Sequence, residues 1–179
     1  MDAYHHWPFL SDTAHPLLSA LWAVLAHGVL AVLVVAPVLW TARHRLGMAA
    51  LAFIAGSVID FDHFIVAGSF DLHTIETLGY RPATHSLLFV ALAGVVTLVL
   101  TRRSLLAWSL FAVWTSHILF DAAGGGERFF YPLGSDEGLP WLALPLGSLA
   151  LLAGSWLIVS RRGARRGVAR AAPVGSVAA

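Results

Sequence analysis

The chain has 179 residues, of which 58% are hydrophobic and only 12% are charged, and this composition is too apolar for a soluble domain of that length. The net charge of +1 provides no basic surface for nucleic acid, and the absence of cysteine excludes disulfides, cysteine–zinc sites and iron–sulfur clusters. The length suits one membrane domain of about five helices, at roughly 20 residues for each span.

Five apolar runs of helical length follow one another, with charges, glycines or prolines between them. They cover residues 16–40, 46–67, 84–100, 104–122 and 139–160. This pattern predicts an all-α, polytopic transmembrane helix bundle with about five spans. We expect residues 1–160 to form a single integral-membrane domain, and residues 161–179, which are rich in Arg, Ala and Gly, to form a basic, disordered cytoplasmic tail.

Arginines are distributed unevenly between the two sides of these spans. Only Arg81 and Arg128 follow the second and fourth runs. The other nine follow the first, third and fifth runs: Arg43, Arg45, Arg102, Arg103, Arg161, Arg162, Arg165, Arg166 and Arg170. The positive-inside rule makes that side cytoplasmic. The expected topology therefore has the N-terminus outside and the C-terminus inside, in the cytoplasmic (inner) membrane.

Ionisable residues interrupt four of the runs, although such side chains are costly in lipid and are usually functional there. They are His27, Asp60, Asp62, His63, His85, His117 and Asp121. At 1.5 Å for each helical residue, they lie roughly 21–27 Å from the nearest cytoplasmic arginine, in the outer half of a hydrocarbon core about 30 Å thick. Because these heights agree across four runs, the sequence predicts one polar site toward the extracytoplasmic side. His15, roughly 42 Å from Arg43, falls near the outer surface.

Helical spacing brings some of these residues onto shared faces. His117 and Asp121 are i and i+4, and Asp60 and His63 are i and i+3. Asp62 points elsewhere on a regular helix, so it joins the site only if the helix unwinds near its outer end, or else it holds a ligand from outside the metal shell. Imidazoles and carboxylates without thiols are the ligands of a hydrolytic metal centre, and they favour Zn²⁺, with Mn²⁺ and Fe²⁺ as alternatives.

Three sequence elements resemble, in order, those of the YdjM-type membrane-bound metal-dependent hydrolases. Residues 57–63 (SVIDFDH) resemble the P-D-x-D-H element of that family, and residues 81–88 (RPATHSLL) resemble its R-G-F-T-H-S-L-L element. Residues 116–121 (SHILFD) are similar to its S-H-x-x-x-D element, and Tyr131-Pro132 after a Gly-rich stretch also fits. Together these elements extend over most of the region between the first and the last apolar run.

The family is related to zinc-dependent phospholipases C and single-strand nucleases, helical proteins with His and Asp ligands around several zinc ions. The resemblance implies a metal-hydrolase-like domain, a His from the first helix, and five further ligands: Asp60, His63, His85, His117 and Asp121. Depth favours His27 over His15 as the first-helix ligand, although the family often places this His closer to the chain start. The chain departs from the pattern at Ile59, where the family has Pro, and at Tyr80, where many relatives have His.

Six candidate ligands exceed what one tetrahedral zinc needs, so we expect two ions, bridged by Asp60 or Asp121. Such a centre would activate water against an ester, preferably a phosphoester, of a lipid-like or amphiphilic substrate reached from the outer face. Asp62 and Arg81 are the candidate catalytic residues. Arg81 could clamp a phosphate oxygen or serve only as an interfacial anchor. The substrate, the metal and the oligomeric state stay open.

Structural roles compete with these assignments. His117 and Asp121 could be a hydrogen-bonded pair, Asp60 and Asp62 could mark a solvated helix end, and His27 could be a lone buried His bonded to a carbonyl. Thr84 or Ser86 could cap the following helix, which is compatible with metal binding by His85. Four loop residues have no assigned role: His73, Glu76, Glu127 and Arg128.

A rival function is that of a haem-binding redox protein, or of a membrane protein that handles metal ions or protons. Every candidate His pair has an Asp beside it, which disfavours haem. The cytoplasmic halves of the spans are almost free of polar residues, which disfavours an ion conduit.

Overall fold

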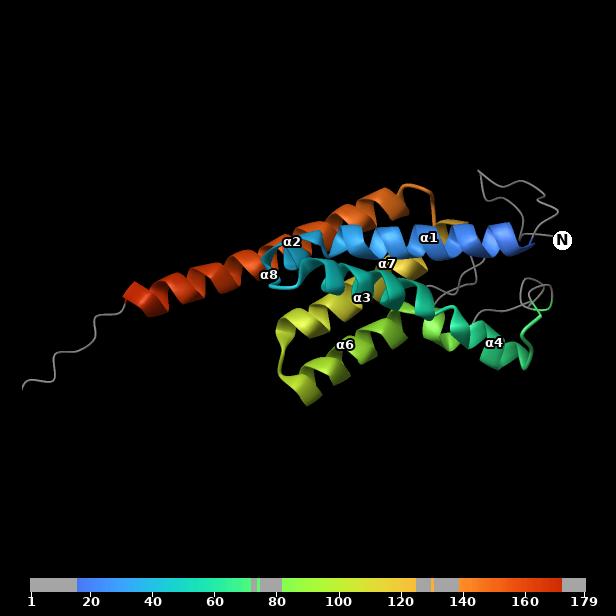
Figure 1. Cartoon of the computed structure of the whole chain (residues 1–179), viewed down its shortest axis with the longest axis horizontal. Helices are drawn as coiled ribbons and strands as arrows, with labels where there is room; N and C mark the ends of the chain where they lie inside the picture. The colour runs from blue at the N-terminus through green and yellow to red at the C-terminus, as the bar shows by residue number, and fades with distance from the viewer. Residues whose placement is uncertain (1–15, 72–73, 75–81, 125–129, 131–138, 172–179) are drawn as a thin grey trace, which may run out of the picture.

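The computed structural model describes residues 16–71, 74, 82–124, 130 and 139–171 (Figure 1). Within this part of the chain all regular structure is helical and no strand occurs. The elements are α1 (Pro16–Val34), α2 (Ala36–Thr41), α3 (Arg45–Val58), α4 (Phe61–Ala67), the 3-10 turn η1 (Ala83–His85), α6 (Leu87–Thr101), α7 (Ser104–Gly124) and α8 (Ala143–Ala171). The predicted all-α fold is confirmed.

The predicted apolar runs correspond to helices of membrane-spanning character. In the described part of the chain, three helical stretches are long and apolar enough to cross a membrane, namely Arg45–Ala67, Ser104–Ala123 and Ala143–Ala164. Two shorter helices, Ala20–Val34 and Leu87–Thr101, are also apolar. The chain is therefore an integral membrane protein built as a helix bundle, as its composition predicted.

The first run is interrupted at Val35, between α1 and α2. Pro37 stands in the first turn of α2 and has no backbone N–H, so it cannot continue the hydrogen-bond ladder of α1. Beside the break, the Ser155 hydroxyl of α8 donates to the Val34 carbonyl at 2.7 Å and accepts from Nε1 of Trp108 at 2.8 Å. This chain of two hydrogen bonds joins α1, α7 and α8.

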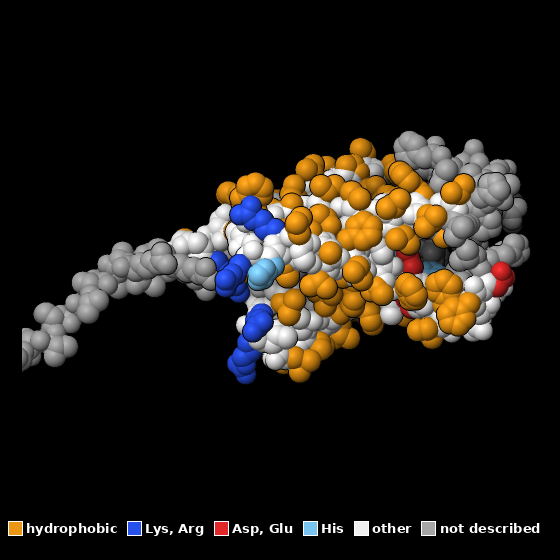
Figure 2. All heavy atoms as spheres, viewed as in Figure 1, with side chains coloured by type: hydrophobic (Ala, Val, Ile, Leu, Met, Phe, Trp, Pro, Cys, Tyr) orange, Lys and Arg blue, Asp and Glu red, His pale blue; other side chains and the backbone are white. Residues whose placement is uncertain are grey.

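Helix α7 lies at the centre of the bundle and packs against α1, α3, α6 and α8. The buried core combines its side chains with those of the surrounding helices, and includes Val34, Val90, Ala112, Val113, Ile118, Leu119, Ala122 and Leu151. The outward faces of the surrounding helices carry many large exposed apolar side chains (Figure 2), as expected of helices that contact lipid.

The two ends of the bundle differ in charge. Among the described residues, Figure 2 shows the arginine side chains gathered at one end of the molecule and the aspartates toward the other. Helix α8 continues through Arg161 to Ala171, so the first part of the predicted tail is helical in the structure, and the disordered cytoplasmic tail stays a prediction. Arg and Ala are strong helix formers, and no proline occurs in this segment before Pro173. Residues 172–179 lie outside the described part of the chain.

Candidate metal centre

The α-helical hydrogen-bond ladder is interrupted at the junction of α3 and α4, where three of the predicted site residues lie, Asp60, Asp62 and His63. The backbone N–H of Asp62 donates to the Ile59 carbonyl, and that of His63 donates to the Asp60 carbonyl, both at 3.2 Å. These i to i+3 bonds belong to a tight turn and interrupt the α-helical ladder. The turn forms although Ile59 stands where the resemblance expected proline. Because the helix is interrupted, Asp60 and Asp62 both face the site.

His85 reaches the site from η1, immediately before α6. Ser86 is the N-cap of α6, and its hydroxyl accepts from the Phe89 backbone N–H at 3.3 Å. Thr84 has a different role, because its hydroxyl donates to the carboxylate of Asp62. Capping is therefore provided by Ser86, and His85 is left fully buried with its ring directed at the carboxylates of the preceding turn.

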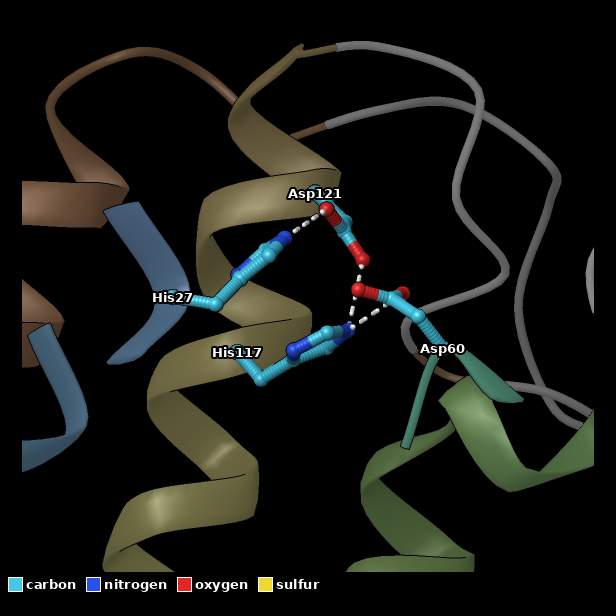
Figure 3. Close-up of side chains that lie close together, drawn as sticks. All are labelled: His27, Asp60, His117 and Asp121. Carbon is cyan, nitrogen blue, oxygen red and sulfur yellow. Dashed lines mark ion pairs between the residues drawn. The ribbon is translucent and has the colours of Figure 1, made fainter. Parts of the chain in front are cut away.

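The first group of potential ligands comes from three parts of the chain: His27 in α1, Asp60 between α3 and α4, and His117 and Asp121 in α7 (Figure 3). Nε2 of His27 lies 3.1 Å from Oδ1 of Asp121. Nε2 of His117 lies 3.1 Å from Oδ2 of Asp121 and 3.2 Å from Oδ1 of Asp60. The rings of His27 and His117 are stacked, with centroids 3.8 Å apart. One ligand atom from each residue lies within 4.8 Å of the others.

A backbone carbonyl orients the ring of His117. Nδ1 of His117 lies 2.7 Å from the carbonyl oxygen of Gly56. A carbonyl only accepts, so Nδ1 carries the proton and the lone pair of Nε2 faces the carboxylates. This role of Gly56 could not be predicted, since a backbone carbonyl has no sequence signature.

The second group consists of Asp60, His63 and His85. Asp62 stands behind it, with Oδ1 2.9 Å from Nδ1 of His63 and Oδ2 3.3 Å from Nδ1 of His85. At these ion-pair distances Asp62 contacts the Nδ1 side of both rings, and the Nε2 atoms point to the other residues of the cluster. Asp62 thus lies outside both groups of potential ligands and contacts two histidines of the second group, and the two roles that the sequence allows for it stay predictions.

Acceptor atoms converge where the two groups meet. Nε2 of His85 lies 3.3 Å from Nε2 of His117 and 3.5 Å from Oδ1 of Asp60. If Nδ1 carries the proton on both rings and Nε2 does not, these nitrogen and oxygen atoms present lone pairs to one another. A cation between them, or a second proton on one imidazole, satisfies such buried acceptors. Imidazole nitrogen with carboxylate oxygen is a donor set that fits Zn²⁺, Mn²⁺ or Fe²⁺.

The cluster is buried on one side and accessible on the other. The side chains of His85 and His117 are 0% exposed and that of His27 is 2% exposed, whereas Asp60 retains 27% and Asp62 18%. The carboxylates from the turn between α3 and α4 therefore form the accessible edge of the cluster.

The structure brings seven predicted site residues together: His27, Asp60, Asp62, His63, His85, His117 and Asp121. Several others lie outside the described residues, and their predicted roles stay predictions. They are Arg81, the first-helix alternative His15, Tyr80, His73, Glu76, Glu127, Arg128, Tyr131 and Pro132.

Comparisons with known proteins identify relatives of the chain. The family model described as YdjM inner membrane protein matches residues 22–178. Transmembrane protein 267 of Xenopus laevis is 37% identical over 101 residues, which cover 52% of this chain and 46% of that protein. Transmembrane protein 267 of Bos taurus is 35% identical over 105 residues, which cover 54% of this chain and 48% of that protein. The matches thus span about half the length of these curated relatives. No solved structure matches.

Proposed function

The chain belongs to the YdjM inner membrane protein family, and from this membership and the geometry of its buried cluster we propose that it is a membrane-embedded metal-dependent hydrolase. The observation that carries the proposal is the convergence of Nε2 of His117, Nε2 of His85 and Oδ1 of Asp60, which lie 3.2–3.5 Å from one another. A structural hydrogen-bonded pair would need one of these atoms to donate. A bound divalent cation satisfies all of them at once.

Two ions fit the arrangement better than one. Asp60 belongs to both ligand groups, so its carboxylate would be shared between two ions if both were bound. Asp121 has one oxygen near Nε2 of His27 and the other near Nε2 of His117, and it belongs to the first group only. A pair of ions held in this way would provide a metal-bound water of lowered pKa and positive charge for the developing oxyanion of an ester.

The residues of this chain supply the rest of the chemistry. Asp62 orients His63 and His85, and the Gly56 carbonyl orients His117, so the ligands are fixed before substrate arrives. The partly exposed edge at Asp60 is where an ester would meet the cluster. Arg81, which the sequence places just before η1, would bind a phosphate oxygen there.

The charge asymmetry of the bundle supports an orientation. The arginine-rich end faces the cytoplasm by the positive-inside rule, which directs the His/Asp cluster to the extracytoplasmic half of the inner membrane. A site at that depth is reached from the lipid or from the outer water. We therefore propose a lipid-like or amphiphilic ester as the substrate, with a phosphoester preferred because Arg81 suits a phosphate.

The experiment is metal analysis of detergent-purified protein followed by ester hydrolysis. The expected result is stoichiometric zinc, manganese or iron, with cleavage of a phospholipid or an activated phosphodiester that Asp60→Asn abolishes. If phosphoesters and acyl esters are both left intact while haem co-purifies, the proposal is wrong and a redox function replaces it.

A further inference from the structure

A groove with purely apolar lining lies beside the metal cluster. It has a volume of about 300 Å³ and is bounded by α1, α7 and the first turn of α8. Its lining residues are Trp22, Leu25, Ala26, Val29, Leu30, Leu33, Phe120 and Leu144. We refer to these eight residues as the α1 groove.

The path of α8 explains why the groove exists. Ser155 of α8 is hydrogen-bonded to the Val34 carbonyl of α1, so the two helices touch there. Figure 1 shows the beginning of α8 standing away from α1. Leu144 is the residue of α8 that lines the groove, while Phe120 of α7 lines it between the two helices. The groove is thus an opening between α1 and the beginning of α8, before the two helices meet at Val34 and Ser155.

Phe120 connects the groove to the cluster. Its ring lines the groove and meets the imidazole of His27 edge-on, with centroids 5.0 Å apart. It also directly precedes Asp121 in α7. Along α1, groove residues occur on both sides of His27, from Trp22 to Leu33, a length of about 16 Å. The groove therefore runs past the cluster at the same depth.

The groove is open sideways, toward the surrounding lipid. Leu25 and Val29 are each 52% exposed and Leu33 is 56% exposed, so its α1 wall is not covered by another described helix. A concave apolar surface at this depth in a bilayer accommodates hydrocarbon, and it has no polar group that could bind a polar ligand. The part beyond His27 extends about 9 Å toward the arginine-rich end, as Leu33 is six residues further along α1.

We propose that the α1 groove binds the hydrocarbon chain of the substrate, so that the enzyme acts on a lipid with at least one long chain and not on a small soluble ester. This inference rests on the proposed hydrolase function. The chain would lie along α1 from the level of His27 toward the middle of the membrane, with the polar head at the metal cluster. Binding of the chain would then set the depth of the scissile bond relative to Asp60 and His117.

The test fills the groove and compares substrates with and without a long chain. Val29→Trp places a large ring in the groove. The control, Val95→Trp, places the same ring on the exposed face of α6, outside the groove. The two valines are similarly exposed, Val29 at 52% and Val95 at 56%. For Val29→Trp, the ratio of kcat/KM for a long-chain phospholipid to that for a chain-free phosphodiester should fall by about 10-fold or more. Val95→Trp should leave this ratio unchanged. An unchanged ratio in Val29→Trp overturns the inference.

A binding measurement separates this inference from the proposed function. A phospholipid with a diazirine in its acyl chain should label the α1 segment that contains residues 22–33, and Val29→Trp should suppress that labelling. If labelling occurs but no ester is cleaved, the groove still binds a lipid chain and the hydrolase function is wrong. If label spreads evenly over all lipid-facing helices and ignores Val29→Trp, the groove is ordinary lipid contact and the inference is wrong.

Discussion

Nδ1 of His117 lies 2.7 Å from the carbonyl oxygen of Gly56, and this contact couples the packing of α3 to the chemistry of α7. Gly56 is also a point of close contact between α3 and α1. A Cβ atom at this position would lie 2.5 Å from Cβ of Ala31 and 3.0 Å from the carbonyl oxygen of His27. One glycine thus positions two histidines, His117 through its carbonyl and His27 through its lack of a side chain.

We expect Gly56→Ala to reduce metal content and stability together. The added methyl has to push α1 away from α3, at a cost of about 1–3 kcal/mol, and it moves His27 and the carbonyl that holds His117. Metal analysis and thermal unfolding of the purified variant measure both effects. Gly47→Ala is the matched control in the same helix, because a Cβ there has no neighbour within 4 Å and should be neutral or slightly stabilising. Full metal content in Gly56→Ala would refute this coupling.

The shared position of Asp60 leads to a prediction about stoichiometry. Wild-type protein should bind two divalent ions, and Asp60→Ala should lose both because its carboxylate belongs to both ligand groups. His63→Ala should lose one ion, since His63 belongs to the second group alone. Elemental analysis of the three proteins at equal concentration tests this. Equal losses in the two variants would contradict the bridging role.

Asp62 should behave as a positioning residue. Asp62→Asn keeps the shape of the side chain but weakens its hold on Nδ1 of His63 and His85, so metal affinity should fall about 10–100-fold while saturating metal restores binding. Chelator competition measures the affinity directly. Asp71→Asn, at an exposed position just beyond α4, serves as the control. A variant that cannot be reloaded with metal would make Asp62 a direct ligand instead.

The orientation is testable because the chain contains no cysteine. A membrane-impermeant maleimide applied to intact cells should label Ser69→Cys, at the same end as the cluster, and should not label Ser176→Cys until the cells are lysed. The reverse pattern would place the cluster on the cytoplasmic side and the arginines outside.

Ser155 should be important for stability although it is far from the cluster. Ser155→Ala leaves the Val34 carbonyl and Nε1 of Trp108 without their hydrogen-bond partner, which should cost about 1–3 kcal/mol. Ser109→Ala removes only a bond to the Leu105 carbonyl within its own helix and should cost much less. Thermal unfolding in detergent compares the two, and equal melting temperatures would refute the role of Ser155.

Residues with a fixed helical spacing were the predictable part of the site. The apolar runs predicted the helices, and the count from the arginines predicted that His27, His85 and His117 lie at one depth, where the structure brings them together. The turn at Ile59 was not predictable from local sequence, because neither proline nor glycine marks it. For that reason the sequence left two roles open for Asp62.

Other features depended on contacts between distant segments. The orientation of His117 by Gly56 links two residues on different helices, and no spacing rule connects them. The disorder predicted beyond Arg161 rested on composition, whereas the helical propensity of Arg and Ala allows α8 to continue to Ala171.

The ligand cluster also connects segments that are far apart in the chain. It gathers α1, the turn before α4, η1 and α7 at one end of the bundle, while the Ser155–Val34 contact holds α1 against α8 further along. Ions bound there would cross-link these four segments and close the loops between them. Without ions this cross-link is lost, so chelation should loosen the cluster end of the bundle first and leave the arginine-rich end packed.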